Sequence, residues 1–124
     1  MSNYDSVFFN PPAPLAFVTL KNSENGLEVS EVPMLLDTGA DATLIPQNCV
    51  QKLDLELKSD IWETEAFDGT VSKSAAVSLQ MILEGKSFRG EFLLIEQNYG
   101  IIGRNVLNLL EIIFDGKNLR WEIL

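Results

Sequence analysis

Two carboxylates stand close together in the stretch MLLDTGADATLIP, which spans residues 34–46. Asp37 comes directly after an apolar run, and Asp41 follows in the same stretch. A lone carboxylate is costly to bury, so we expect it to be neutralised, paired, or brought to a cleft by a turn of the chain. Each arrangement implies a different function, and the rest of the sequence restricts the choice.

The available residue types limit what chemistry these carboxylates can join. The 124 residues include no histidine and one cysteine, Cys49, which excludes the usual zinc sites and every histidine-based triad. We interpret Cys49 as a small hydrophobe, because no histidine exists to activate its thiol. Asp37 and Asp41 lack the oxygen-ligand pattern of a calcium loop. We therefore expect no metal and no cofactor, and any catalysis has to rest on carboxylates.

Charge and length restrict the partners. Nine basic and eighteen acidic residues give a formal charge of −9, which repels phosphate backbones and anionic lipid. We therefore expect neither nucleic acid nor a membrane as a partner. The N-terminus has no basic flank before a long apolar stretch, so we expect no secretory signal and a cytoplasmic protein. The length suits one compact domain and is too short for two lobes with separate cores.

The elements that position the carboxylates are predicted to be strands. Short apolar segments alternate with turn residues, which is typical of an all-β domain. The strand that ends at Asp37 contains Pro33, which indicates a local edge or bend. Asp68 and Gly69 suit a two-residue hairpin turn between two of the strands. Strands are expected over residues 15–20, 27–36, 61–67, 70–77, 77–83, 88–94, 101–102, 111–114 and 119–124.

Two short helices are also predicted. Pro46 suits the first position of a helix over residues 47–53. Gly103 ends the strand at 101–102, and apolar residues at helical spacing follow, with Asn105 as a candidate N-terminal cap. The proline-rich residues 1–14 predict an extended N-terminal arm, followed by one domain over residues 15–124.

Two motifs together carry a family resemblance. The segment LLDTGAD at residues 35–41 ends a strand, and IIGRN at residues 101–105 opens a helix about sixty residues later. A hairpin lies between them. This order of elements resembles the retropepsins, the single-domain aspartic proteases, from residue 15 to the C-terminus. The resemblance implies an all-β acid-protease barrel with one lobe per chain and a short helix after Gly103-Arg104-Asn105.

The chemistry of that family suits a carboxylate site. Aspartic proteases need two carboxylates that share one proton, so that one acts as a base towards water and the other as an acid towards the peptide carbonyl. This chain holds a single DTG motif. Two copies of Asp37 therefore have to come from two chains, and a homodimer becomes part of the expected mechanism. The resemblance implies a peptide or protein substrate, bound as an extended and largely hydrophobic segment.

The resemblance also implies roles for the neighbours of Asp37. Thr38 is expected to hydrogen-bond across the twofold axis, and Gly39 to accept from the substrate backbone. Ala40 lacks the hydroxyl of the serine found in many two-lobed relatives, so we expect a less acidic pH optimum. Asp41 is expected to bind the substrate main chain and to form an ion pair with Arg104, which would also be structural in its own right.

The hairpin over residues 62–77 takes the position of the family's flap, which closes over the substrate and excludes water. Its predicted tip holds only one glycine and carries a charge. Ordinary strand packing is the alternative for the aromatic and aliphatic candidates. The expected substrate contacts on the flap and next to the dyad are Phe67, Asp68, Gly69, Ile101 and Ile102.

Two other functions stay open. A retropepsin-like module can keep the fold for peptide binding or dimerisation and be catalytically silent. An acidic β-domain can also contain a DTG turn by coincidence. An intact DTG argues against loss of catalysis, because an unused buried dyad only costs stability. Turnover separates the first of these alternatives from an active protease.

Overall fold

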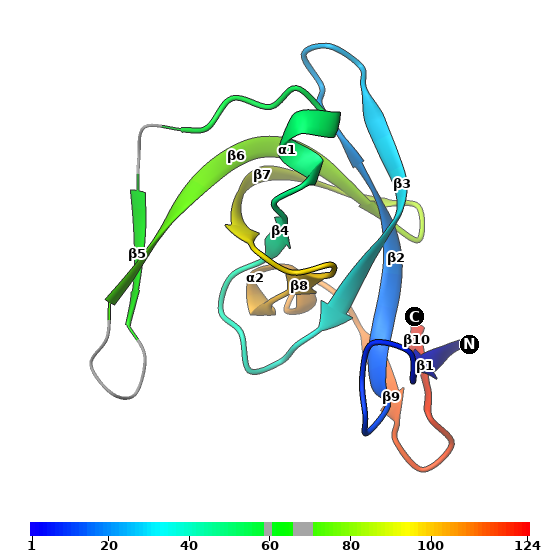
Figure 1. The fold of residues 1–124 in the computed structure, drawn as a ribbon. Coiled ribbons are helices and arrows are strands. Elements are labelled where there is room, and N and C mark those ends of the chain that lie inside the picture. Colours follow the sequence, from blue (N-terminus) through cyan, green and yellow to red (C-terminus); the bar gives the residue numbers. More distant parts are fainter. Residues whose placement is uncertain (59–60, 66–70) are drawn as a thin grey trace.

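The structure, a computed structural model, describes residues 1–58, 61–65 and 71–124. This part of the chain forms ten strands and two short helices (Figure 1), so the all-β prediction is confirmed. The strands are β1 (Ser2–Asp5), β2 (Ala13–Lys21), β3 (Glu28–Leu36), β4 (Leu44–Pro46), β5 (Ile61–Glu65), β6 (Val71–Leu83), β7 (Lys86–Ile95), β8 (Gly100–Ile102), β9 (Ile112–Asp115) and β10 (Arg120–Ile123). The helices are α1 (Cys49–Lys52) and α2 (Arg104–Leu107).

Strands β6, β7, β4, β8, β3 and β2 follow one another around a barrel. The barrel closes because β2 also pairs with β6, where Thr19 lies opposite Ile82. Closure leaves the barrel strands few free edges. β5 extends the sheet beyond β6, and β1, β10 and β9 extend it beyond β2.

The core follows the alternation of the sequence. Along the second half of β6, Val77, Leu79, Met81 and Leu83 are buried and Ser78 between them is exposed. Successive side chains of a strand point to opposite faces, so this pattern fills the barrel with one face of β6. Cys49 is also buried in the core cluster, which confirms its interpretation as a small hydrophobe.

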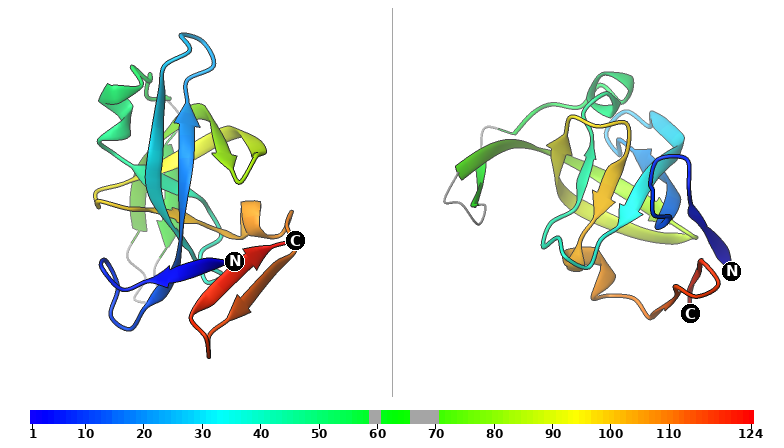
Figure 2. Two further views of the ribbon diagram at one scale, coloured as in Figure 1. Left: turned by 90° about the vertical axis from the view of Figure 1, so that its right-hand side faces the viewer. Right: turned by 60° about the horizontal axis from the view of Figure 1, so that its bottom comes forward.

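β6 differs from the prediction, since one strand of 13 residues replaces the two that were expected. Its first residues pair with β5, from Val71 opposite Glu65 to Ala75 opposite Ile61. The remainder pairs with β7. No glycine or proline interrupts Val71–Leu83, so nothing forces a break. Figure 2 shows β5 and the start of β6 projecting from the barrel.

The predicted N-terminal arm is part of the folded unit. β1 pairs on one side with β2, where Tyr4 lies opposite Pro14. On the other side it pairs with β10, where Ser2 lies opposite Trp121. β2 begins at Ala13, so the expected boundary after residue 14 falls inside a strand. Figures 1 and 2 show both chain ends on this side of the barrel.

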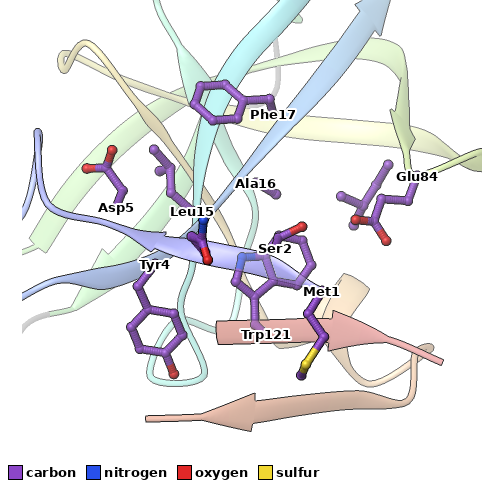
Figure 3. A pocket seen from close by; sticks show the side chains of 11 residues that line it. Met1, Ser2, Tyr4, Asp5, Leu15, Ala16, Phe17, Glu84 and Trp121 are labelled. Carbon is purple, nitrogen blue, oxygen red and sulfur yellow. The ribbon is translucent and has the colours of Figure 1, made fainter. Parts of the chain in front are cut away.

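A pocket of about 500 Å³ opens between β1, β2 and β10. Figure 3 shows Ser2 of β1 and Trp121 of β10 at this pocket, where the two residues lie opposite each other in paired strands. The Trp121 side chain is 2% exposed, and its Nε1 has no hydrogen-bond partner among the described residues. The pocket is lined by the N-terminal strand and not by the DTG loop.

No helix in the described ranges is long and apolar enough to cross a membrane.

Candidate active site

The two motifs of the sequence meet at one edge of the barrel. β3 and β8 run parallel, and Leu36 lies opposite Ile102. The next backbone N–H, that of Asp37, donates to the Ile102 carbonyl over 3.0 Å. The DTG loop and the start of α2 therefore leave their strands side by side, although more than sixty residues separate them.

The Asp37 carboxylate lies on a tight turn at the surface of the single chain. Its Oδ1 accepts a hydrogen bond of 2.9 Å from the Gly39 backbone N–H. The Ala40 N–H donates to the Asp37 carbonyl over 3.2 Å. Asp37 is half-buried, and Thr38 and Gly39 are exposed. The turn thus brings the carboxylate out of the apolar strand that precedes it, one of the three arrangements expected from the sequence.

Gly39 and Gly103 both stand where a side chain would crowd neighbouring atoms, a side-chain oxygen for Gly39 and backbone atoms for Gly103. A Cβ on Gly39 would lie 3.1 Å from the Asp37 Oδ1, tighter than ordinary contact. A Cβ on Gly103 would collide with backbone atoms of Ala42, including the nitrogen at 2.9 Å. The backbone is much harder to move than a side-chain tip, so Gly103 is required for the close approach of the two motifs.

Arg104 holds the DTG loop from the second motif. Its backbone N–H donates to the Ala40 carbonyl over 2.8 Å. Its Nη1 donates to the Thr38 carbonyl, also over 2.8 Å. Asp41 is exposed on the same loop, and its ion pair with Arg104 stays a prediction.

Asn105 does not cap α2, so that prediction is wrong. The N-cap is Gly103, and no side chain caps it from the N-cap position. The Asn105 Oδ1 instead accepts from the Thr43 hydroxyl over 2.7 Å. The same hydroxyl oxygen accepts from the Gly103 N–H over 3.1 Å. Asparagine is favoured at caps, but this contact with a distant residue takes its side chain elsewhere.

Thr43 is the residue of this site that sequence reasoning missed. It is 1% exposed, one of two buried polar residues in the described part of the chain. Its only signal in the sequence is a hydroxyl placed directly before the apolar segment Leu44–Pro46.

The candidate subsite residues on β8 differ in position. Ile102 is fully buried in the core cluster, which favours the alternative of strand packing for that side chain. Ile101 is half-buried and stays a candidate for contact with substrate. Phe67, Asp68 and Gly69 lie outside the described residues.

Within the described ranges, no group of three histidine, cysteine, aspartate or glutamate side chains is arranged so that it could hold a metal ion. The pKa of the Cys49 thiol is raised by burial, and Lys52 opposes that shift only in part. A buried thiol that keeps its proton is a poor nucleophile. Asp37 stays the candidate for acid–base chemistry at this site, and Asp41 stays the candidate for contact with the substrate.

Comparisons with known proteins agree with this geometry. The family model described as gag-polyprotein putative aspartyl protease matches residues 25–108. The chain is similar to the EIAV protease complexed with the inhibitor HBY-793, with a TM-score of 0.56, 17% identity, and coverage of 77% of this chain and 86% of that one. It is also similar to the simian foamy virus (mac) protease, with a TM-score of 0.54, 14% identity, and coverage of 77% and 92%. A comparison with curated proteins finds no match.

The matched region covers more than half of the chain and contains both motifs of the site. The similar solved structures share the barrel and confirm the predicted fold. The chain belongs to the family of gag-polyprotein putative aspartyl proteases, and its fold is that of the retropepsins.

Proposed function

We propose that this protein is an aspartic endopeptidase that works as a homodimer. The observation that carries the proposal is the Asp37 carboxylate, which lies half-buried on a turn with its Oδ1 held by the Gly39 N–H. Each chain supplies one such carboxylate, and the chemistry requires two. A twofold axis beside the DTG loop brings Asp37 and its copy together.

The proposed reaction uses a water molecule and two carboxyl groups. The ionised Asp37 of one chain takes a proton from the water, whose oxygen attacks the peptide carbonyl carbon. The protonated Asp37 of the other chain gives its proton to the carbonyl oxygen. The tetrahedral intermediate then breaks its C–N bond as the nitrogen takes the proton that the first Asp37 removed from the water, and one hydroxyl of the intermediate returns a proton to the second Asp37. The products are a new carboxyl terminus and a new amino terminus.

Exposure of the loop supports a role in contacts between chains and with substrate. Thr38, Gly39 and Asp41 are exposed in the single chain. We assign the Thr38 side chain to the contact across the twofold axis, and Gly39 and Asp41 to the substrate main chain. The Thr38 carbonyl is already occupied by Arg104, so the loop is held from inside its own chain before it meets a partner.

The substrate is proposed to be an extended, largely hydrophobic peptide segment. The paired backbones of β5 and β6 supply a projecting hairpin at the flap position. A flap can add hydrogen bonds along an extended peptide and exclude water from the dyad. Ile101 is the candidate on β8 for contact with a hydrophobic side chain.

Cleavage of a denatured peptide pool tests the proposal. The products are read by mass spectrometry from mildly acidic to neutral pH, with the wild type beside Asp37→Asn. Asp54→Asn is the matched control, since it removes the charge of an exposed carboxylate that lies outside the DTG loop. We expect cleavage by the wild type and the control, and none by Asp37→Asn. Absence of cleavage by a folded wild-type dimer would instead support a catalytically silent peptide-binding or dimerisation module.

A further inference from the structure

We infer that Thr43 is a positioning residue for Asp37, a role that rests on the proposed protease function. Its hydroxyl closes the far end of the DTG loop onto the second motif. The oxygen accepts from the Gly103 N–H over 3.1 Å and the hydroxyl proton goes to the Asn105 Oδ1 over 2.7 Å. One buried hydroxyl thus satisfies a donor and an acceptor of the turn that begins α2.

The loop between Asp37 and Thr43 is fixed at both ends against the same segment. At its start, the Asp37 N–H donates to the Ile102 carbonyl over 3.0 Å. At its end, the Thr43 hydroxyl contacts the two residues on either side of Arg104. The residues in between form no strand or helix. Their course, and hence the direction of the Asp37 carboxylate, depends on these two attachments and on Arg104.

Thr43 is also tied into the barrel wall. Its carbonyl accepts from the Leu93 N–H over 3.2 Å, and β4 begins at the next residue. The hydroxyl is 60 residues away from Gly103 in the chain and is buried from water. Loss of this hydroxyl would leave the buried Gly103 N–H without its acceptor and the Asn105 Oδ1 without this donor, which favours a shift of the loop.

A small shift matters because the two copies of Asp37 have to share one proton. Misplacement of a reacting group by about 1 Å can cost about a hundredfold in rate. Thr43 does not touch the reacting atoms, so we expect its loss to lower kcat through the position of Asp37, and any change of KM to come from Gly39 and Asp41 on the same loop. Thr43→Val keeps the shape of the side chain and removes only the hydrogen bonds. We expect its kcat to fall about tenfold.

The experiment compares kcat and KM for Thr43→Val, Thr43→Ser and Asn105→Ala. Thr43→Ser keeps the hydroxyl and is expected to retain the wild-type kcat. Asn105→Ala removes one of the two hydrogen bonds of the Thr43 hydroxyl, so its kcat is expected to fall less than that of Thr43→Val. This variant tests the role of Thr43 even if Thr43→Val does not fold. Thr19→Val on β2 is the matched control, with the same chemical change away from the loop.

Amide hydrogen exchange gives a second readout. The Gly103 N–H should exchange faster in Thr43→Val than in Thr43→Ser or Thr19→Val, because only the first variant lacks its acceptor. A wild-type kcat in Thr43→Val, or an equal fall of kcat in Thr19→Val, would overturn the role of Thr43 and leave the protease proposal intact. Failure of the wild type to cleave any peptide would overturn the proposed function instead.

Discussion

The Arg104 Nη1 donates a hydrogen bond of 2.8 Å to the Thr38 carbonyl oxygen. The two residues come from the two motifs and lie 66 positions apart. The bond fixes the peptide unit between Thr38 and Gly39, so a side chain outside the DTG loop helps to set the geometry of the loop. A guanidinium suits this task because it stays charged at any working pH.

Arg104→Ala is expected to lower both stability and activity. Removal of one charged hydrogen bond at an exposed site should cost about 1 kcal/mol of unfolding free energy. We expect kcat to fall more than this stability loss explains, since the loop beside Asp37 loses its anchor. Arg89→Ala, which removes an exposed arginine on β7, serves as the control. Urea unfolding and peptide cleavage measure the two effects, and equal activity in the two variants would refute the anchoring role.

Gly103→Ala is expected to destabilise the fold strongly for a change of one methyl group. The added Cβ would collide with the Ala42 backbone, and we expect a loss of about 2 kcal/mol. Gly90→Ala is a matched control on β7, because a Cβ there meets nothing within 4 Å. Thermal or urea unfolding of the two variants should differ clearly. A Gly103→Ala protein as stable as Gly90→Ala would contradict the close approach.

The buried Cys49 thiol is expected to lower the stability of the folded chain at alkaline pH. Burial raises the pKa of its thiol above the ordinary value of 9.0. Above that pH the unfolded chain releases the proton while the folded chain keeps it, so rising pH favours unfolding. The contribution of the protonated Cys49 thiol to the unfolding free energy is fully present below pH 9.0. It is lost as the pH rises through the pKa of the thiol in the folded chain.

The test compares the wild type with Cys49→Ala. The absolute stability of the variant will differ because a cavity forms, so the informative quantity is the slope of unfolding free energy against pH above pH 9.0. We expect a shallower decline in Cys49→Ala. Identical slopes would show that this thiol does not contribute.

Removal of residues 1–6 is expected to destabilise the single chain. Ser2 pairs with Trp121 inside the same chain, so deletion of β1 uncovers an indole that is 2% exposed. We expect a loss of about 2 kcal/mol and a red-shifted fluorescence of Trp121, measured in a Trp62→Phe background. Removal of Met1 alone is the control. Unchanged emission after the longer deletion would contradict the pairing of β1 with β10.

Local patterns predicted most of the barrel. Alternation of apolar and polar residues along Val77–Leu83 identified the inward face of β6, and turn residues located the closing hairpin of β9 and β10. These signals act over a few residues, which is why a single sequence reveals them. The same reasoning divided β6 into two strands, because the pattern of apolar and polar residues does not show that one continuous strand pairs first with β5 and then with β7.

The candidate site was predicted in part. Asp37, Thr38 and Gly39 were found because the DTG motif is contiguous, and their catalytic roles stay predictions. The contact between Thr43 and Asn105 joins positions 62 apart, and no local periodicity encodes it. Asn105 therefore looked like a helix cap, a task that depends only on neighbouring residues.

The central claim is that one active site needs Asp37 from two chains. The most direct measurement mixes wild type with Asp37→Asn in equal amounts, allows the subunits to exchange, and follows cleavage at a fixed total concentration. If both copies are required and the chains pair at random, activity falls to about a quarter of the pure wild type. Activity of about one half would mean that each chain acts alone and would contradict the two-chain site.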